Sequence, residues 1–184
     1  MSLLPAFKVG LWNAWIFILP LVVLSIFLAK ILVKRESGES PDLTNKEKAV
    51  FTAHHVIFLA SCVYGIFLPL KLGTLWFYGG ILIYVPGMLI EILALLGFYT
   101  TPIDKPITGG IYSISRHPMY VGTFLINIGI SMSCLSWIFL LVAIIGIFLE
   151  SSLAAMEERW CLEKYGGAYQ LYMDSTPKWI GIPK

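Results

Sequence analysis

The chain has 184 residues, of which 58% are hydrophobic and only 13% charged, and its mean hydropathy is +0.80. A soluble domain carries about 25% charged residues, so this composition indicates a protein whose surface faces lipid. The formal net charge is only +2 and no basic run occurs, which excludes a nucleic-acid-binding surface. The cysteines, Cys62, Cys134 and Cys161, show no CxxC spacing, so neither a disulfide framework nor a zinc site is predicted.

Five apolar runs predict membrane-spanning helices: Leu11–Val33, Ala49–Leu72, Thr74–Phe98, Met119–Met132 and Trp137–Leu153. The first three have about 20 residues or more, enough to cross a hydrocarbon core of about 30 Å. Only four residues separate the short fourth run from the fifth, which predicts a helical hairpin. We therefore expect an all-α integral membrane protein of one domain, residues 1–184. Three spans fall in residues 1–98, and a loop, the hairpin and a C-terminal segment fall in 99–184.

The basic residues predict the orientation of these spans. With five crossings, eleven of the thirteen Lys and Arg residues fall on one side, and only Lys8 and Lys71 fall on the other. The positive-inside rule then places the N-terminus outside and the C-terminus in the cytoplasm. The eleven residues on the cytoplasmic side are Lys30, Lys34, Arg35, Lys46, Lys48, Lys105, Arg116, Arg159, Lys164, Lys178 and Lys184.

The connections between the runs differ in character. Residues 34–48 are predicted to form a mixed-charge surface loop that leads into a helix capped by the Thr-x-x-Glu sequence Thr44–Glu47. Tyr99–Pro118 is the longest irregular segment, and a structureless loop of that length usually carries function. Glu157–Tyr172 has helical character and precedes Pro177, which predicts a C-terminal helical segment in the cytoplasm.

A basic and aromatic cluster marks the start of the fourth run. Pro118 suits the first turn of a helix, because the N–H that it lacks would have no partner there. Arg116 and His117 then precede the helix, where free N–H groups and the helix dipole favour an anion. Tyr120 and Tyr112 add aromatic faces nearby. The alternative is that Arg116 only sets the topology, that His117 is a helix cap and that the tyrosines form an interfacial belt.

An acidic cluster marks the end of the fifth run. Because the hairpin is tight, Glu157 and Glu158 should lie within about 10 Å of the start of the fourth helix. Glu150 precedes Glu157 by seven residues and lies on the same helix face. An acid at that depth is costly unless it faces protein or water, so we interpret these carboxylates as one wall of a pocket. A solvated helix face is the alternative.

Three further ionisable residues lie in the apolar runs. Glu91 is inside the third run, where an acid marks either a functional site or a paired structural group. His54 and His55 are adjacent, so they face different sides of a helix and do not chelate one metal, and an interfacial role is favoured. The candidate substrate residues are therefore His54, His55, Glu91 and Glu150, and no metal site is predicted.

The combined pattern resembles a known enzyme family. Gly110-Ile-Tyr-Ser-Ile-Ser-Arg-His-Pro-Met-Tyr120, then Glu157-Glu158, then Tyr165-Gly-Gly-Ala-Tyr-Gln-Leu-Tyr172 is similar to the isoprenylcysteine carboxyl methyltransferases. That family belongs to a wider group of small membrane methyltransferases, which includes phospholipid N-methyltransferases. The resemblance covers roughly residues 105–178. It implies that S-adenosylmethionine binds at the cytoplasmic face, that S-adenosylhomocysteine is the product, and that a lipophilic acceptor enters from the bilayer.

The resemblance also implies a set of site residues. The cofactor-binding residues would be Gly110, Ile111, Tyr112, Arg116, His117, Pro118, Tyr120, Glu157, Glu158, Tyr169 and Tyr172, and the catalytic residues Arg116, Tyr120 and Glu158. The residue types suit the ligand. Arg116 and His117 suit its carboxylate, and Glu157 or Glu158 suits its ammonium group. Tyr120, Tyr112 or Tyr172 suits the sulfonium through a cation–π contact.

The acceptor remains open between two lipophilic classes. The carboxylate of a prenylated cysteine, in a small molecule or a protein, is the first expectation, because it is ionised near neutral pH and needs only orientation by an Arg. The alternative is the amine of phosphatidylethanolamine, which must lose a proton to a base such as Glu158 or Glu91. The lipid bilayer is the other expected partner, and neither nucleic acid nor metal is expected.

Two other functions remain as alternatives. A reductase of the sterol-reductase type would need basic residues for the 2′-phosphate of NADPH, and Tyr99–Tyr120 offers only Lys105 and Arg116. A small transporter or assembly factor without enzymatic activity is the other alternative. Five spans permit no pair of equal inverted repeats, which weighs against a transporter.

Overall fold

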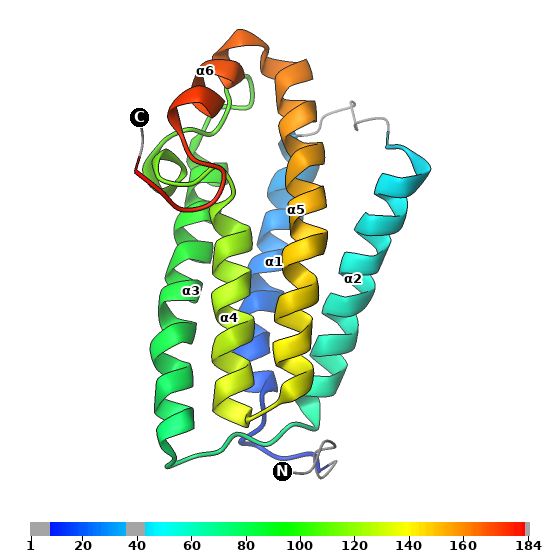
Figure 1. Cartoon of the computed structure of the whole chain (residues 1–184), viewed down its shortest axis with the longest axis vertical. Helices are drawn as coiled ribbons and strands as arrows, with labels where there is room; N and C mark the ends of the chain where they lie inside the picture. Colours follow the sequence, from blue (N-terminus) through cyan, green and yellow to red (C-terminus); the bar gives the residue numbers. More distant parts are fainter. Residues whose placement is uncertain (1–7, 36–42, 183–184) are drawn as a thin grey trace.

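The protein is a bundle of helices (Figure 1). The structure, a computed structural model, describes residues 8–35 and 43–182; part of the predicted loop 34–48, and Lys184, lie outside this range. Within these residues the only β-pairing is a single bridge between Asn13 and Pro69, so the all-α prediction is confirmed. The elements are α1 (Trp15–Arg35), α2 (Asn45–Ile66), α3 (Leu75–Thr100), the 3-10 helix η1 (Gly110–Ser113), α4 (Pro118–Cys134), α5 (Trp137–Tyr165) and α6 (Gly167–Ser175).

Four of the described helices are long and apolar enough to cross a membrane, namely α1, α2, α3 and α5. Helix α4 has 17 residues, which at 1.5 Å per residue makes it about 26 Å long. The fourth apolar run is therefore a helix, and it is shorter than the other four. The five-span count and the orientation of the termini stay predictions.

Two predicted helix boundaries are wrong at the end of the bundle where α4 meets α5. The first apolar run was expected to be helical from Leu11, but α1 begins at Trp15. The second apolar run was expected to stay helical to Leu72, but α2 ends at Ile66. The residues that follow pair with the segment before α1: Ala14 N–H donates to the Leu68 carbonyl (2.8 Å), and Leu70 N–H donates to the Trp12 carbonyl (2.9 Å). Apolar residues serve a buried connection as well as a helix, so hydropathy alone extended both runs too far.

Two boundaries also differ at the opposite end, where α4 begins and α5 ends. Helix α5 continues to Tyr165, about three turns beyond the predicted end of the fifth run. The predicted helical segment Glu157–Tyr172 is therefore the end of α5 and the start of α6, broken at Gly166 with φ +56°. The expected structureless segment Tyr99–Pro118 is shorter than predicted, because α3 runs to Thr100 and η1 lies within it.

Glycines bring α3 and α4 into close contact. A Cβ atom on Gly80 would lie 2.5 Å from the Gly129 carbonyl oxygen, and one on Gly87 would lie 2.9 Å from the Gly122 carbonyl oxygen. Small residues facing one another let helix backbones approach closely in a membrane. This contact fixes α4, and with it the start of α4, against α3.

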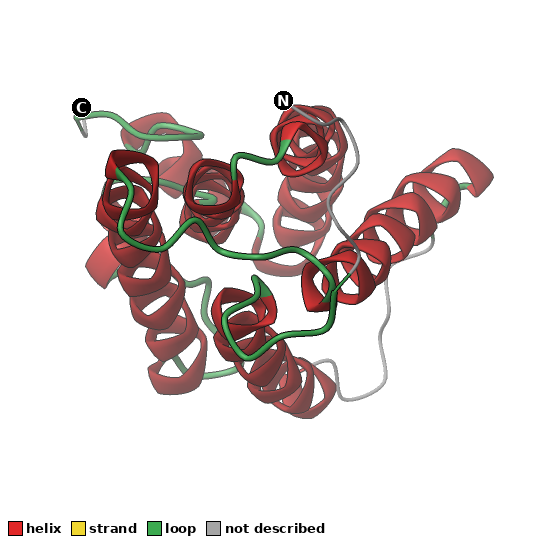
Figure 2. Cartoon of the chain, turned by 90° about the horizontal axis from the view of Figure 1, so that it is seen from below, coloured by secondary structure: helices red, strands yellow, loops and turns green. Residues whose placement is uncertain are grey.

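The helices α1 to α5 form a closed circle, in which each helix packs against two others. Helix α4 packs between α3 and α5, α5 packs on α2, and α1 closes the circle between α2 and α3 (Figures 1 and 2). An apolar core fills the half of the circle near the α4–α5 turn, with Ile18, Tyr84, Ile126, Ile130 and Phe139 as members. At the other end, α6 and the segment containing η1 cover the start of α4 (Figure 1).

Candidate functional site

The start of α4 is held by the C-terminal segment of the chain. Pro118 is the first residue of the helix, as the sequence predicted. His117 stands at the cap position, but its side chain makes no capping hydrogen bond to the described residues. The backbone N–H of Arg116 donates to the Pro177 carbonyl (3.0 Å), and the N–H of Gly181 donates to the Ile114 carbonyl (3.3 Å). Residues far apart in the sequence therefore fix Arg116 and His117 in one place.

The basic residues before α4 contact the acids at the end of α5. The Arg116 Nε lies 3.2 Å from the Glu158 Oε1, and the Lys178 Nζ lies 3.5 Å from the Glu158 Oε2. The His117 Nε2 lies 3.0 Å from the Glu158 Oε1, and its Nδ1 lies 3.3 Å from the Glu157 Oε2. We call Arg116, His117, Glu157, Glu158 and Lys178 the charged cluster. The hairpin thus brings the basic residues before α4 and the acidic residues near the end of α5 into contact, as the sequence predicted.

The imidazole of His117 is placed between two carboxylates. Burial by itself lowers the pKa of His117, but the hydrogen bonds and negative charges of Glu157 and Glu158 outweigh that effect and raise the pKa above its ordinary value. A doubly protonated imidazole donates from both ring nitrogens, which matches a carboxylate facing each of them. The two acids therefore favour the protonated form of His117, in which the ring joins them.

Arg116 has donor capacity that the protein does not use. Its Nη1 donates to the Met173 carbonyl (3.3 Å). Its Nε is buried and has no hydrogen-bond acceptor among the described residues, although the Glu158 carboxylate is at ion-pair distance. The contact with Glu158 is therefore electrostatic, because the N–H is not directed at the oxygen. A guanidinium N–H without an acceptor suits an additional carboxylate, such as that of an amino-acid ligand.

Aromatic residues surround the charged cluster. The Tyr120 hydroxyl donates to the Glu157 carboxylate, and its ring stacks on the His117 ring with centroids 5.7 Å apart. Trp179 also packs on the His117 ring, with the two ring centroids 5.9 Å apart. The sequence reasoning missed Trp179 and Lys178, because both follow Pro177 in a segment with no helical or motif pattern.

The other predicted tyrosines, Tyr112 of η1 and Tyr169 and Tyr172 of α6, form a buried cluster. Tyr112, Tyr169 and Tyr172 are buried together with Ala94 of α3. The Tyr172 hydroxyl donates to the Tyr112 carbonyl (2.7 Å), and burial raises the pKa of Tyr172, so this hydroxyl remains a donor. These rings support the start of α4, and their predicted contact with a cofactor stays a prediction.

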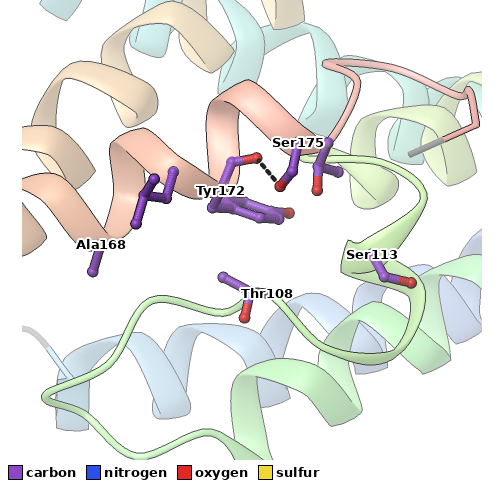
Figure 3. A pocket seen from close by; sticks show the side chains of 7 residues that line it. Thr108, Ser113, Ala168, Tyr172 and Ser175 are labelled. Carbon is purple, nitrogen blue, oxygen red and sulfur yellow. Dashed lines mark hydrogen bonds between the residues drawn. The ribbon is translucent and has the colours of Figure 1, made fainter. Parts of the chain in front are cut away.

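A shallow hollow of about 430 Å³ lies between the segment 101–117 and α6 (Figure 3), and its lining includes no residue of the charged cluster. Tyr172 forms one wall, and Thr108 and Ser113 face it from the other chain segment. Gly110, at φ +63°, starts η1 next to this wall, in a backbone conformation that other residues rarely adopt. The remaining lining residues are Ala168, Leu171, Ser175 and Thr176. The sequence reasoning missed the hydroxyl residues, since single Ser and Thr residues give no signal.

Three of the four candidate substrate residues lie deeper in the bundle. Thr123 of α4 donates to the Glu91 carboxylate at 2.7 Å, and the His54 Nε2 of α2 lies 3.9 Å from the Glu150 Oε1. His55 lies apart from them, because its Nδ1 is 2.8 Å from the Phe51 carbonyl of its own helix and its side chain is exposed. The structure therefore brings His54 and Glu150 together and leaves His55 out.

Comparison with known proteins identifies the family. Residues 70–168, more than half of the chain, match the phospholipid methyltransferase family, which is related to the isoprenylcysteine carboxyl methyltransferases. No curated protein and no solved structure matches the chain. The matched range includes α3, α4 and α5, and with them four residues of the charged cluster, Arg116, His117, Glu157 and Glu158. The family and the four long apolar helices together identify an integral membrane methyltransferase. This chain belongs to the phospholipid methyltransferase family.

Proposed function

We propose that the protein transfers a methyl group from S-adenosylmethionine to a lipophilic acceptor held in the membrane. The observation that carries this proposal is the contact between Arg116–His117 before α4 and Glu157–Glu158 near the end of α5. Charges of both signs meet there, at one end of the bundle. The amino-acid part of S-adenosylmethionine also carries both charges, a carboxylate and an ammonium group.

The residues present fit that ligand. The buried Arg116 Nε–H has no acceptor among the described residues, so it suits the ligand carboxylate. His117, whose protonated form the neighbouring acids favour, is a second donor. The Glu157 side chain is 49% exposed, so it suits an incoming ammonium group, and the ring of Tyr120 beside it suits the sulfonium. Glu158 is more deeply buried and holds Arg116 and His117 in position.

Methyl transfer requires the protein mainly to orient the donor and the acceptor. S-adenosylmethionine supplies an activated methyl group on a positively charged sulfur, and the transfer neutralises that charge. The residues of this chain must then align donor and acceptor and exclude water. Arg116, Tyr120 and Glu158 are the proposed catalytic residues, since they lie where the donor's charged groups would be held.

Two acceptors follow from two different observations. The motif resemblance favours the carboxylate of a prenylated cysteine, which Arg116 would orient. The amine of a phospholipid head group is the second candidate, favoured by Glu91 and Glu150, which are buried in the same half of the bundle as the charged cluster. Methyl transfer from tritiated S-adenosylmethionine to each acceptor, measured side by side in nanodiscs, distinguishes them.

Binding of S-adenosylhomocysteine tests the donor site directly. We expect the purified protein to bind it in isothermal titration calorimetry, and His117→Ala and Glu157→Ala to weaken binding by more than tenfold. Glu163→Ala is the matched control, because this exposed acid lies on α5 outside the charged cluster. A helical, monodisperse wild-type protein that does not bind S-adenosylhomocysteine would contradict the proposal.

A further inference from the structure

The chain after α6 forms a short loop against the start of α4. It consists of Pro177–Ile182, and we call it the tail loop. Its Pro177 carbonyl accepts from the Arg116 N–H (3.0 Å), and its Gly181 N–H donates to the Ile114 carbonyl (3.3 Å). A Cβ atom on Gly181 would lie 2.8 Å from the Pro177 Cγ, so the loop folds back on itself more closely than a side chain there would allow. The tail loop follows the range that matches the family, which ends at residue 168.

The side chains of the tail loop divide into two groups. Lys178 and Trp179 contact the charged cluster, with the Lys178 Nζ 3.5 Å from the Glu158 Oε2 and the Trp179 ring packed on the His117 ring. Ile180 and Ile182 are instead exposed, by 65% and 91%. Two large apolar side chains, two residues apart, are therefore left uncovered beside the charged cluster.

The tail loop lies near a boundary of the bilayer core. Trp179 contacts His117, the residue before α4, and α4 is about 26 Å long. A hydrocarbon core is about 30 Å thick, so a helix of this length nearly spans it and starts near one boundary. Figures 1 and 2 both show the chain after α6 at the edge of the bundle rather than over its centre. Lipid can therefore reach Ile180 and Ile182.

The exposed apolar surface of α3 continues past this level. Gly87 of α3 lies against Gly122 of the antiparallel α4. Leu96 is about 13.5 Å along α3 from that contact, whereas His117 is about 7.5 Å from it along α4 in the same direction. Leu96 and Tyr99 are both exposed. A bilayer that covers these α3 side chains therefore reaches the level of the tail loop.

We propose that the tail loop binds the lipid surface of the bilayer, with Ile180 and Ile182 in contact with lipid, and that this contact holds Lys178 and Trp179 on the charged cluster. Trp and Lys suit this location, because the indole ring and the lysine stem are apolar whereas their polar ends reach water or head groups. The second part rests on the proposed function, because the charged cluster is the proposed donor site.

The physical reason is the difference between water and lipid around the two isoleucines. The tail loop contains no helix or strand, and a loop of this kind opens at a low free-energy cost. Contact of Ile180 and Ile182 with lipid removes apolar area from water, which favours the closed loop. In the closed loop, Lys178 supplies a positive charge to Glu158, and Trp179 covers part of the His117 ring. The bilayer thus helps to order the charged cluster.

A fluorophore on Ile182 tests the contact with lipid. Ile182→Cys is labelled with the fluorophore NBD in full-length protein whose Cys62, Cys134 and Cys161 are replaced by alanine, with one copy in each nanodisc. Phosphatidylcholine with a doxyl group near the start of its acyl chain should quench this label at least twofold. Glu163→Cys is the matched control, because Glu163 is exposed and lies about 7.5 Å beyond Glu158 on α5. Its label should be quenched much less.

Substitution of the exposed isoleucines tests the link to the charged cluster. In nanodiscs, we expect Ile180→Asp/Ile182→Asp to weaken S-adenosylhomocysteine binding at least fivefold, because two carboxylates keep the loop out of lipid. Ile180→Leu/Ile182→Leu is the matched control and should bind like the wild type. Both variants should keep the helical content of the wild type, since exposed side chains contribute little to packing.

The outcomes separate the two proposals. Equal quenching at positions 182 and 163 would place the tail loop in water and overturn the inference. A blue-shifted emission without quenching would show that protein, such as a second copy of the chain, covers the loop, with the same consequence. Wild-type affinity in the Asp double variant would overturn the link to the charged cluster. A wild-type protein that does not bind S-adenosylhomocysteine would instead defeat the proposed function, and the quenching would still decide where the loop lies.

Discussion

The two halves of the bundle are built on different principles. Near the α4–α5 turn, the interior is mainly apolar and the α3 and α4 backbones touch through glycines, and the buried polar side chains there, such as Asn13 and Ser131, donate hydrogen bonds to backbone carbonyls. In the other half, the interior contains Glu91, Glu150, His117 and Glu158, which are costly to bury. The comparison teaches that one half is held mainly by apolar packing, whereas the other half holds buried ionisable groups through ion pairs and hydrogen bonds, and it is there that we propose the ligand site.

The largest expected effect comes from removing the shared acid of the charged cluster. Glu158→Ala leaves the Arg116 and His117 charges buried without their common carboxylate, and breaking a buried ion pair in this way costs about 3–5 kcal/mol. We expect a clear fall in Tm and loss of S-adenosylhomocysteine binding. Glu157→Ala, at the half-exposed neighbouring acid, should weaken binding and leave Tm nearly unchanged. Equal stability of the two variants would show that burial does not distinguish the two acids.

A smaller effect is expected from crowding the apolar half. A Cβ on Gly80 would lie 2.5 Å from the Gly129 carbonyl oxygen and also meet Ser133, so Gly80→Ala must displace α4 from α3. We expect a loss of about 1–3 kcal/mol in the free energy of unfolding. Gly79→Ala is the control on the neighbouring residue, because its Cβ would meet only the flexible end of Met132. Thermal unfolding of both variants in the same detergent measures the difference. If Gly80→Ala is as stable as Gly79→Ala, the close contact between α3 and α4 at Gly80 does not stabilise the fold.

The smallest effect concerns pH. The pKa of His117 is raised in the folded protein by Glu157 and Glu158, so its ionised form stabilises the fold. That contribution is complete below the unfolded pKa of about 6.5 and is lost as the pH rises through the higher folded value. Tm should therefore fall as the pH is raised above about 6.5. His117→Gln should lose this part of the pH dependence; an unchanged Tm profile in that variant would assign the titration to another group.

Several features could be predicted because they depend on neighbouring residues. The Thr44–Glu47 capping box forms as predicted, with the Glu47 carboxylate accepting from the Thr44 N–H at 2.8 Å. Pro118 begins α4, since a helix has no partner for the N–H of its first residue. Only four residues separate the fourth and fifth apolar runs, which predicted the hairpin. Because a hairpin places the start of one helix beside the end of the next, it also predicted that Arg116 and His117 lie near Glu157 and Glu158. The roles of the site residues stay predictions.

Other features depend on residues that are distant in the sequence. Lys178 reaches Glu158 only because the segment after α6 folds back on the start of α4. His54 meets Glu150 only because α2 packs on α5, and nothing in the sequence distinguished His54 from His55 for that contact. The end of α2 likewise depends on the pairing of the residues after it with the segment before α1.

The sequence by itself determined that the chain forms apolar helices, where most of them lie, and that charges of both signs gather at one end of the last two. These properties follow from hydropathy, chain length and local hydrogen bonding, which act over a few residues. The tertiary structure decided which ionisable side chains face one another inside the bundle. That outcome depends on helix neighbours and rotation, because a carboxylate's free energy is set by the groups within a few ångströms of it, whatever their distance along the chain.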